Sequence, residues 1–269
     1  MDLCFKILDV DMNIKAVSRG VNEVSLVYTQ AYAHGDRIIL ETSGEEGFVW
    51  IQMDDAIGKG LVYITGNVEY IVPFEEQRSN LSPKAFYGNR HLLHARAAKD
   101  YDVEGYRNLS LNIYDQYQMK DCFPHAVTNV ETRGKTVFAA QNAIDGVVVN
   151  NSYGEWPYQS WGIDRKEDAL IKIEFGRTVA IDCIVLYTRA DFPHDNWWKS
   201  VHFTFSDGSE LDMEMEKSEL PSEITFPMRQ VKWLEMNHMV KSEDASPFPA
   251  LTQIEVYGIE VGNSVDFVL

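Results

Sequence analysis

The stretch "VHFTFSDGSELDMEME", residues 201–216, decides the fold of the region around it. Its first half places three apolar side chains, Val201, Phe203 and Phe205, at every second position, with polar side chains between them. Successive side chains of a strand point to opposite faces of a sheet, so this alternation is typical of a half-buried β-strand. An Asp-Gly pair follows, and the alternation then resumes. Because Asp-Gly favours the tight turn of a hairpin, the stretch predicts two antiparallel strands with one face on a core.

The same period recurs on both sides of this hairpin. "ALIKIEFG" (169–176) places Ile171, Ile173 and Phe175 on one face, which we expect to point inward. The other strand candidates are short and lie between Gly, Asn, Asp and Pro: "RIILETS" (37–43), "FVWIQMD" (48–54), "GLVYITG" (60–66), "EYIVPF" (69–74), "LSLNIYD" (109–115), "VKWLEMN" (231–237) and "QIEVYGIEV" (253–261). The one helix-like stretch is "AFYGNRHLLHARAAKDY" (85–101). Strands and helices do not alternate, so the sequence predicts an all-β, antiparallel sandwich rather than a doubly wound sheet.

The best domain boundary lies near "YDQYQMKDC" (114–122), where a polar segment follows the last of the early strand candidates. The predicted organisation is an N-terminal β-rich domain of unassigned role, residues 1–115, and a C-terminal β-sandwich, residues 116–269. Each is long enough to bury a core of its own.

Charge and composition exclude several classes of partner. The 24 basic and 41 acidic residues give a formal net charge of −17, which repels phosphate backbones and anionic lipid. We therefore expect no nucleic-acid and no membrane partner, and a neutral or cationic ligand. No apolar run is long enough to span a bilayer, the first residues do not resemble a secretory signal, and the three cysteines are sparse. These features predict a cytoplasmic protein with reduced thiols.

Three segments of the C-terminal region resemble the galactose-binding-domain-like β-sandwich family, of the discoidin or coagulation-factor type C kind. They are "AAQNAIDGVVVNNSYGEWPYQSWG" (139–162), "DALIKIEFGRTVAIDCIVLYTR" (168–189) and "LTQIEVYG" (251–258). Many carbohydrate-binding modules share this fold. The resemblance implies a jelly roll of antiparallel strands whose loops bind a ligand at one end.

Two loops combine aromatic and polar side chains: "GEWPYQSWG" (154–162) and "RADFPHDNWWKS" (189–200). A flat ring can cover the C–H face of a pyranose while charged and amide side chains bond its hydroxyls. The alternative is that some of the rings seal the end of the sandwich, since Trp is usually largely buried. Trp197 and Trp198 are adjacent, so in an extended chain one packs inward and the other faces out. The candidate ligand-binding residues are Trp156, Tyr158, Arg189, His194, Asp195, Trp197 and Trp198.

The resemblance also implies a structural calcium beside the Asn-Ala-x-Asp-Gly turn. The matching positions are Asn142, through its carbonyl, Asp145, and Glu255 on the last strand. Calcium takes six to eight oxygen ligands, which such a turn can supply in part. The alternative is an Asp-Gly turn whose carboxylate bonds its own backbone.

The sequence thus predicts non-catalytic binding of a neutral carbohydrate by the C-terminal sandwich. Two alternatives stay open. One is a glycan-processing enzyme or its accessory subunit, although no catalytic motif is present and a carboxylate pair cannot be chosen among 41 acidic residues. The other is a protein-interaction module, which would need an extensive exposed apolar patch.

Overall fold

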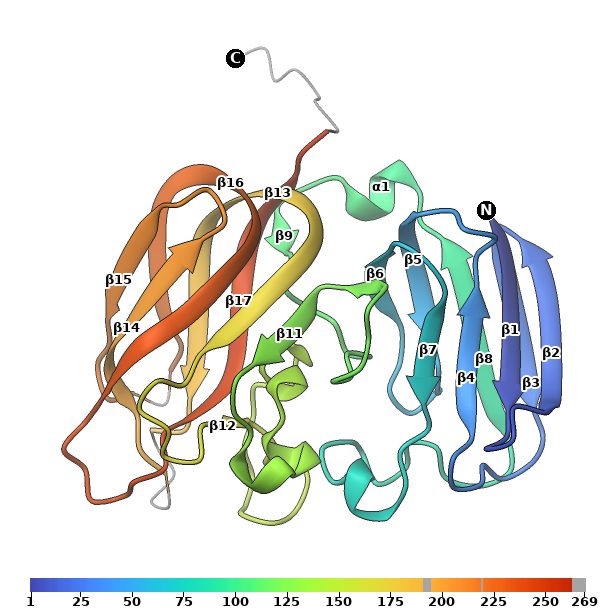
Figure 1. Cartoon of the computed structure of the whole chain (residues 1–269), viewed down its shortest axis with the longest axis horizontal. Coiled ribbons are helices and arrows are strands. Elements are labelled where there is room, and N and C mark those ends of the chain that lie inside the picture. The colour runs from blue at the N-terminus through green and yellow to red at the C-terminus, as the bar shows by residue number, and fades with distance from the viewer. Residues whose placement is uncertain (191–194, 219, 263–269) are drawn as a thin grey trace.

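The computed structural model describes residues 1–190, 195–218 and 220–262. Figure 1 shows two β-domains side by side, the N-terminal one in blue and cyan and the C-terminal one in yellow to red. All strand pairs of the named elements are antiparallel, which confirms the predicted all-β class. No helix in the described part of the chain is long and apolar enough to cross a membrane.

The N-terminal domain is built from two antiparallel sheets that share one core. One has the order β2-β1-β4-β7 and the other β10-β6-β5-β8-β3. Buried side chains from both sheets, among them Phe5, Ile38 and Val49, form a single cluster. The strands are β1 (Asp2–Leu8), β2 (Ile14–Val21), β3 (Glu23–Tyr28), β4 (Arg37–Glu41), β5 (Gly47–Gln52), β6 (Gly60–Ile64), β7 (Val68–Ile71), β8 (His91–Ala97) and β10 (Cys122–Phe123).

The helix-like stretch at 85–101 has a strand at its centre, β8, in place of the expected helix, which corrects the sequence-based expectation. Within it, β8 pairs with both β3 and β5, and His91, Leu93 and Ala95 point into the core. Only a short helix, α1 (Asp100–Val103), follows it. The period of two along "HLLHARA" therefore prevails over the helix preference of its Leu, Ala and Arg residues.

The C-terminal strands form an eight-stranded antiparallel sheet that folds over on itself. The order is β12-β17-β13-β16-β14-β15, with β11 beside β13 and β9 beside β17. Short 3-10 turns connect strands within each domain. In the N-terminal domain, η1 (Glu75–Arg78) lies between β7 and β8. In the C-terminal domain, β11 and β12 are connected through η2 (Thr132–Gly134), η3 (Thr136–Phe138) and η4 (Ala140–Ile144). The strands are β9 (Arg107–Asn108), β11 (His125–Thr128), β12 (Trp161–Gly162), β13 (Ile171–Thr188), β14 (Trp198–Phe205), β15 (Glu210–Glu214), β16 (Ser222–Lys241) and β17 (Ala250–Glu260).

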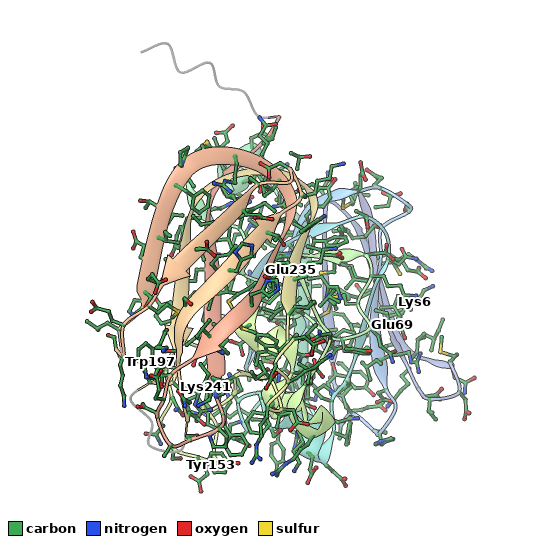
Figure 2. The ribbon with its side chains drawn as sticks, turned by 60° about the vertical axis from the view of Figure 1, so that its left-hand side comes forward. Lys6, Glu69, Tyr153, Trp197, Glu235 and Lys241 are labelled. Carbon is green, nitrogen blue, oxygen red and sulfur yellow. The ribbon has the colours of Figure 1, made fainter. Side chains whose placement is uncertain are left out.

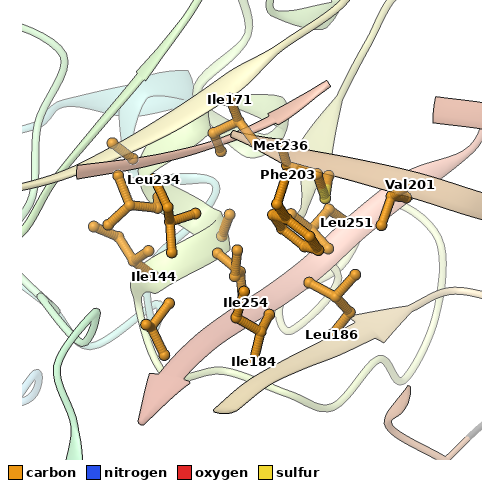
Figure 3. Close-up of a cluster of buried hydrophobic side chains, with 14 of the residues drawn as sticks. Ile144, Ile171, Ile184, Leu186, Val201, Phe203, Leu234, Met236, Leu251 and Ile254 are labelled. Atoms are coloured by element: carbon orange, nitrogen blue, oxygen red, sulfur yellow. The ribbon is translucent and has the colours of Figure 1, made fainter. Parts of the chain in front are cut away.

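The core of this sandwich contains the residues that the alternation selected; Figure 3 labels three of them, Ile171, Val201 and Phe203. Ile171, Ile173 and Phe175 of β13 and Val201, Phe203 and Phe205 of β14 are all 0–2% exposed, so the predicted inward face is confirmed. The pairing of β13 shifts register just after Phe175, at the bend of this strand. Gly176 occupies the bend with φ +70, and a Cβ there would lie 2.3 Å from the Phe123 ring. A larger residue would therefore both strain the backbone and collide with Phe123.

The segment between the two domains contributes to both of them. Strand β9, residues 107–108, pairs with β17 of the C-terminal sheet, whereas Tyr114 and Cys122 belong to the N-terminal core. Strand β10 then pairs with β6 before the chain enters the C-terminal sandwich. The chain thus crosses between the cores several times around the predicted boundary at residues 115 and 116. The three cysteines are buried free thiols.

Candidate functional site

A pocket opens at the loop end of the C-terminal sandwich, and we call it the loop-end pocket. It is lined by residues of the segments 132–138, 153–165 and 248–250, together with Asp195. It is a shallow hollow with a cavity volume of about 80 Å³. Pockets that enclose a drug-sized ligand have volumes of about 300–1,000 Å³, so a ligand at this hollow would lie largely on its surface. Tyr153 lies at this end of the molecule, on the same side as Trp197 (Figure 2).

Aromatic rings form one part of its wall. Tyr153 is 50% exposed and lines the pocket, and its ring meets the ring of Tyr158 at a centroid distance of 6.0 Å. Tyr158 in turn meets Phe138 edge to face at 6.4 Å. On the other side, the guanidinium of Arg165 lies over the ring of Phe248, 4.6 Å from its centroid. These contacts hold an exposed ring and a charged group at fixed positions around one hollow.

Polar groups of both signs complete the lining. Arg133, Arg165, Asp164 and Asp195 contribute two positive and two negative charges. The hydroxyl of Ser160 is buried and has no hydrogen-bond partner within residues 1–190, 195–218 and 220–262. A buried hydroxyl without a partner costs free energy, so a ligand or water that bonds it is favoured.

Arg189 supports the pocket from beneath and does not reach solvent. It is 2% exposed, its Nη1 donates to the Tyr158 carbonyl at 2.5 Å, and its Nε lies 2.5 Å from Asp195 Oδ2. The arginine therefore links the two loops, 154–162 and 189–200, in which the sequence predicts ligand-binding residues. The prediction that Arg189 contacts a ligand directly is corrected: its side chain is a positioning group for Tyr158 and Asp195.

The tryptophans divide between core and surface. Trp198 is 0% exposed and belongs to the core of the sandwich, so it does not line a surface site, contrary to its place among the candidates. Trp197 is partly buried against the same core. Trp156 is 39% exposed on the loop that carries Tyr153, but it is not part of the pocket lining. His194 lies outside the described residues.

The side chains at the Asp-Gly turn do not fit the calcium that the resemblance implies. Asp145 accepts hydrogen bonds from the Val147 backbone N–H at 2.8 Å and from Gln159 Nε2 at 3.0 Å. Asn142 Nδ2 donates to the carbonyls of Thr136 and Ser160, and its Oδ1 accepts from Asn80. Donors thus surround the turn where calcium would need oxygen ligands.

The last strand supplies an amide, and not the predicted carboxylate, to this turn. Gln253 Oε1 accepts the Gly146 backbone N–H at 3.1 Å, whereas Glu255 accepts from Tyr257, two residues further along β17. Across the described residues, no group of three or more His, Cys, Asp or Glu side chains is placed to hold a metal. Burial without a nearby cation raises the pKa of Asp145 to about 7.

The fold and the loop-end pocket define a class of protein: an all-β protein with two hydrophobic cores and a pocket at the loop end of its antiparallel C-terminal sandwich. Residues 123–257 match the model of a family described as a domain of unknown function (DUF7402), and the chain belongs to that family. No curated protein matches the chain.

Solved structures similar to the chain include a chitosan-binding module from a Paenibacillus sp. IK-5 chitosanase/glucanase. It has 19% sequence identity and a TM-score of 0.38, and the match covers 56% of this chain and 98% of that one. A family 32 carbohydrate-binding module from C. perfringens NanJ, in complex with galactose, has 13% identity and a TM-score of 0.40, covering 57% and 99%. A fucose-binding module from Streptococcus pneumoniae has 15% identity and a TM-score of 0.39, covering 57% and 98%.

Several residues of the pocket were not among the sequence candidates. Tyr153 lies within the segment 139–162 that carries the family resemblance. Its neighbours in the sequence do not distinguish it from Tyr158 as a pocket residue. Arg165 and Phe248 lie more than eighty residues apart and meet only through the fold. Arg133 has a positive φ of 55 in the turn that borders the pocket, a conformation that an Arg-Gly pair alone does not predict.

Proposed function

We propose that the C-terminal sandwich binds carbohydrate at the loop-end pocket without transforming it. The observation that carries this proposal is the combination found there: the exposed Tyr153 ring, the Arg165 guanidinium, the Asp195 carboxylate and the unpartnered Ser160 hydroxyl around one hollow. A sugar ring offers an apolar C–H face to an aromatic side chain and a rim of hydroxyls to the polar groups.

The charge balance of the lining supports a neutral glycan. Arg133, Arg165, Asp164 and Asp195 line the pocket, and Asp195 is paired with the buried Arg189, so the net charge around the hollow is only about one positive unit. Hydroxyl groups can accept from arginine and donate to carboxylates, and a neutral sugar can satisfy both kinds of group at once. The aspartates would repel a fully anionic ligand, and the arginines would repel a fully cationic one.

The expected affinity is modest. Covering one face of a pyranose with the Tyr153 ring contributes on the order of 1–2 kcal/mol, and each charge-assisted bond a similar amount. With the entropic cost of association set against these gains, dissociation constants of roughly micromolar to millimolar are expected.

The test is a glycan array followed by calorimetry with the best ligand. Tyr153→Ala and Arg165→Ala should each weaken binding about tenfold or more, because each removes roughly 1.4 kcal/mol or more of contact. Tyr87→Ala is the matched control, since Tyr87 is a 74% exposed tyrosine of the N-terminal domain, and it should bind as the unaltered chain does.

A reducing-sugar release assay on the same glycans separates binding from hydrolysis. No release is expected. Absence of binding to the whole array, or binding that both pocket variants leave unchanged, would contradict the proposal, and release of sugar would favour the glycan-processing alternative.

A further inference from the structure

We propose that His202 and His238 form a binding site for a divalent transition-metal ion of the Zn²⁺, Cu²⁺ or Ni²⁺ class. The two residues lie on adjacent strands, β14 and β16, on the face of the sheet that points away from the core. His202 stands between the buried Val201 and Phe203, so its side chain points to the opposite, outer face. This site is separate from the loop-end pocket and independent of carbohydrate binding.

A β-bulge brings His238 to this place. Ser200 pairs with Val240 and His202 pairs with Asn237, so β16 has one more residue than β14 between these pairs. His238 lies in this bulge with a φ of 43, in the left-handed region that side chains other than glycine rarely adopt. Bulges redirect a side chain, and strained backbone is concentrated at functional sites. The bulge turns His238 toward His202, with 5.8 Å between the ring centroids.

Hydrogen bonds orient both rings in the manner of metal-binding imidazoles. His202 Nδ1 lies 2.7 Å from Asp212 Oδ1, and His238 Nδ1 lies 2.9 Å from Asn237 Oδ1. The Asn237 amide is itself fixed, because its Nδ2 donates to Glu235 Oε1 at 2.8 Å; Glu235 is labelled in Figure 2. A ring whose Nδ1–H donates to such an oxygen keeps a basic lone pair on Nε2, the arrangement usual for histidine ligands.

The separation of the rings suits one shared ion. A metal–nitrogen bond of about 2.0–2.1 Å plus the ring radius of about 1.1 Å places two bound imidazole centroids roughly 5.1 Å apart at a tetrahedral angle, and roughly 5.8 Å apart at an angle of about 130°. The observed separation is 5.8 Å with 69° between the ring planes, so a small rotation of one imidazole about its side-chain bonds is needed for tetrahedral binding of a shared ion. Imidazole nitrogens select zinc, copper and nickel over calcium and magnesium. Because the described residues offer no third His, Cys, Asp or Glu ligand, water would complete the coordination, and micromolar affinity is expected.

The experiment is calorimetric titration of the tag-free chain with Zn²⁺ at neutral pH. His202→Asn and His238→Asn should each weaken the first binding event at least tenfold. Asp212→Asn should weaken it by about ten- to a hundredfold, because it removes the acceptor that orients His202. His94→Asn is the matched control: His94 also lies beside a carboxylate, Glu23 at 2.9 Å, but within the described residues it has no ring contact with a second histidine. It should leave the affinity unchanged.

A copper titration followed by electron paramagnetic resonance gives an independent readout. Superhyperfine splitting from two nitrogen ligands is expected, and from at most one in either histidine variant. If the double variant His202→Asn/His238→Asn binds Zn²⁺ as tightly as the unaltered chain, or if the copper spectrum shows no imidazole nitrogen, the proposal is overturned.

Discussion

Replacing Trp198 with alanine is expected to lower the free energy of unfolding by about 3–5 kcal/mol. The indole is 0% exposed, and it packs in the core of the C-terminal sandwich. Its Nε1 has no hydrogen-bond partner in the described part of the chain, so the loss comes from packing and from the cavity left behind. Urea denaturation followed by circular dichroism measures it.

Trp156→Ala is the control for this prediction. Trp156 is 39% exposed and lies on a loop, so its removal should change the free energy of unfolding by less than about 1 kcal/mol. Equal losses for the two variants would contradict the assignment of Trp198 to the core and of Trp156 to the surface.

Asp145→Asn is expected to remove a pH dependence of stability. In the folded chain, burial raises the pKa of Asp145 from 3.8 to about 7, so folding favours the protonated carboxyl. The contribution of this group is fully present below pH 3.8 and is lost as pH rises to about 7. One pKa unit corresponds to about 1.4 kcal/mol, so the loss amounts to on the order of a few kcal/mol.

Urea denaturation at several pH values from 4 to 8 checks this prediction. Other groups also titrate, so the quantity to compare is the difference in free energy of unfolding between the variant and the unaltered chain. Asparagine keeps the acceptor for the Val147 N–H and carries no charge to bury, so this difference should grow in favour of the variant as pH rises and level off near pH 7.

A calcium site at the same turn would give the opposite result. Added calcium would then raise the melting temperature of the unaltered chain by mass action, a chelator would lower it, and Asp145→Asn would abolish both effects. From the amide side chains that contact the turn, we expect the melting temperature to respond to neither.

The strands could be predicted because their pattern is local. Alternation along β13 and β14 identifies which side chains face the core, since a strand has only two faces. The same rule explains why the helix expected at residues 85–101 was wrong. The alternation along β8 is short, and residues with good helix propensity obscured it. Pairing with β3 and β5 decided the structure there.

The candidate site was harder to predict because it depends on register and on distant loops. Gln253 and Glu255 lie two residues apart on the same face of β17, so alternation cannot tell which of them reaches the Asp145 turn. Arg189 and Asp195 were each predicted to bind the ligand, but their mutual ion pair turns the arginine inward. Arg165 and Phe248 meet only after both loops are placed.

The measurement that tests carbohydrate binding at the loop-end pocket most directly is a nitrogen–proton NMR titration of the labelled chain with the tightest glycan from the array. We expect saturable shifts at the amides of pocket residues such as Tyr153, Gly162 and Arg165, and unchanged amides in the N-terminal core, such as those of Val49 and Ile64. Shifts confined to other parts of the molecule, or a spectrum unchanged at millimolar glycan, would contradict it.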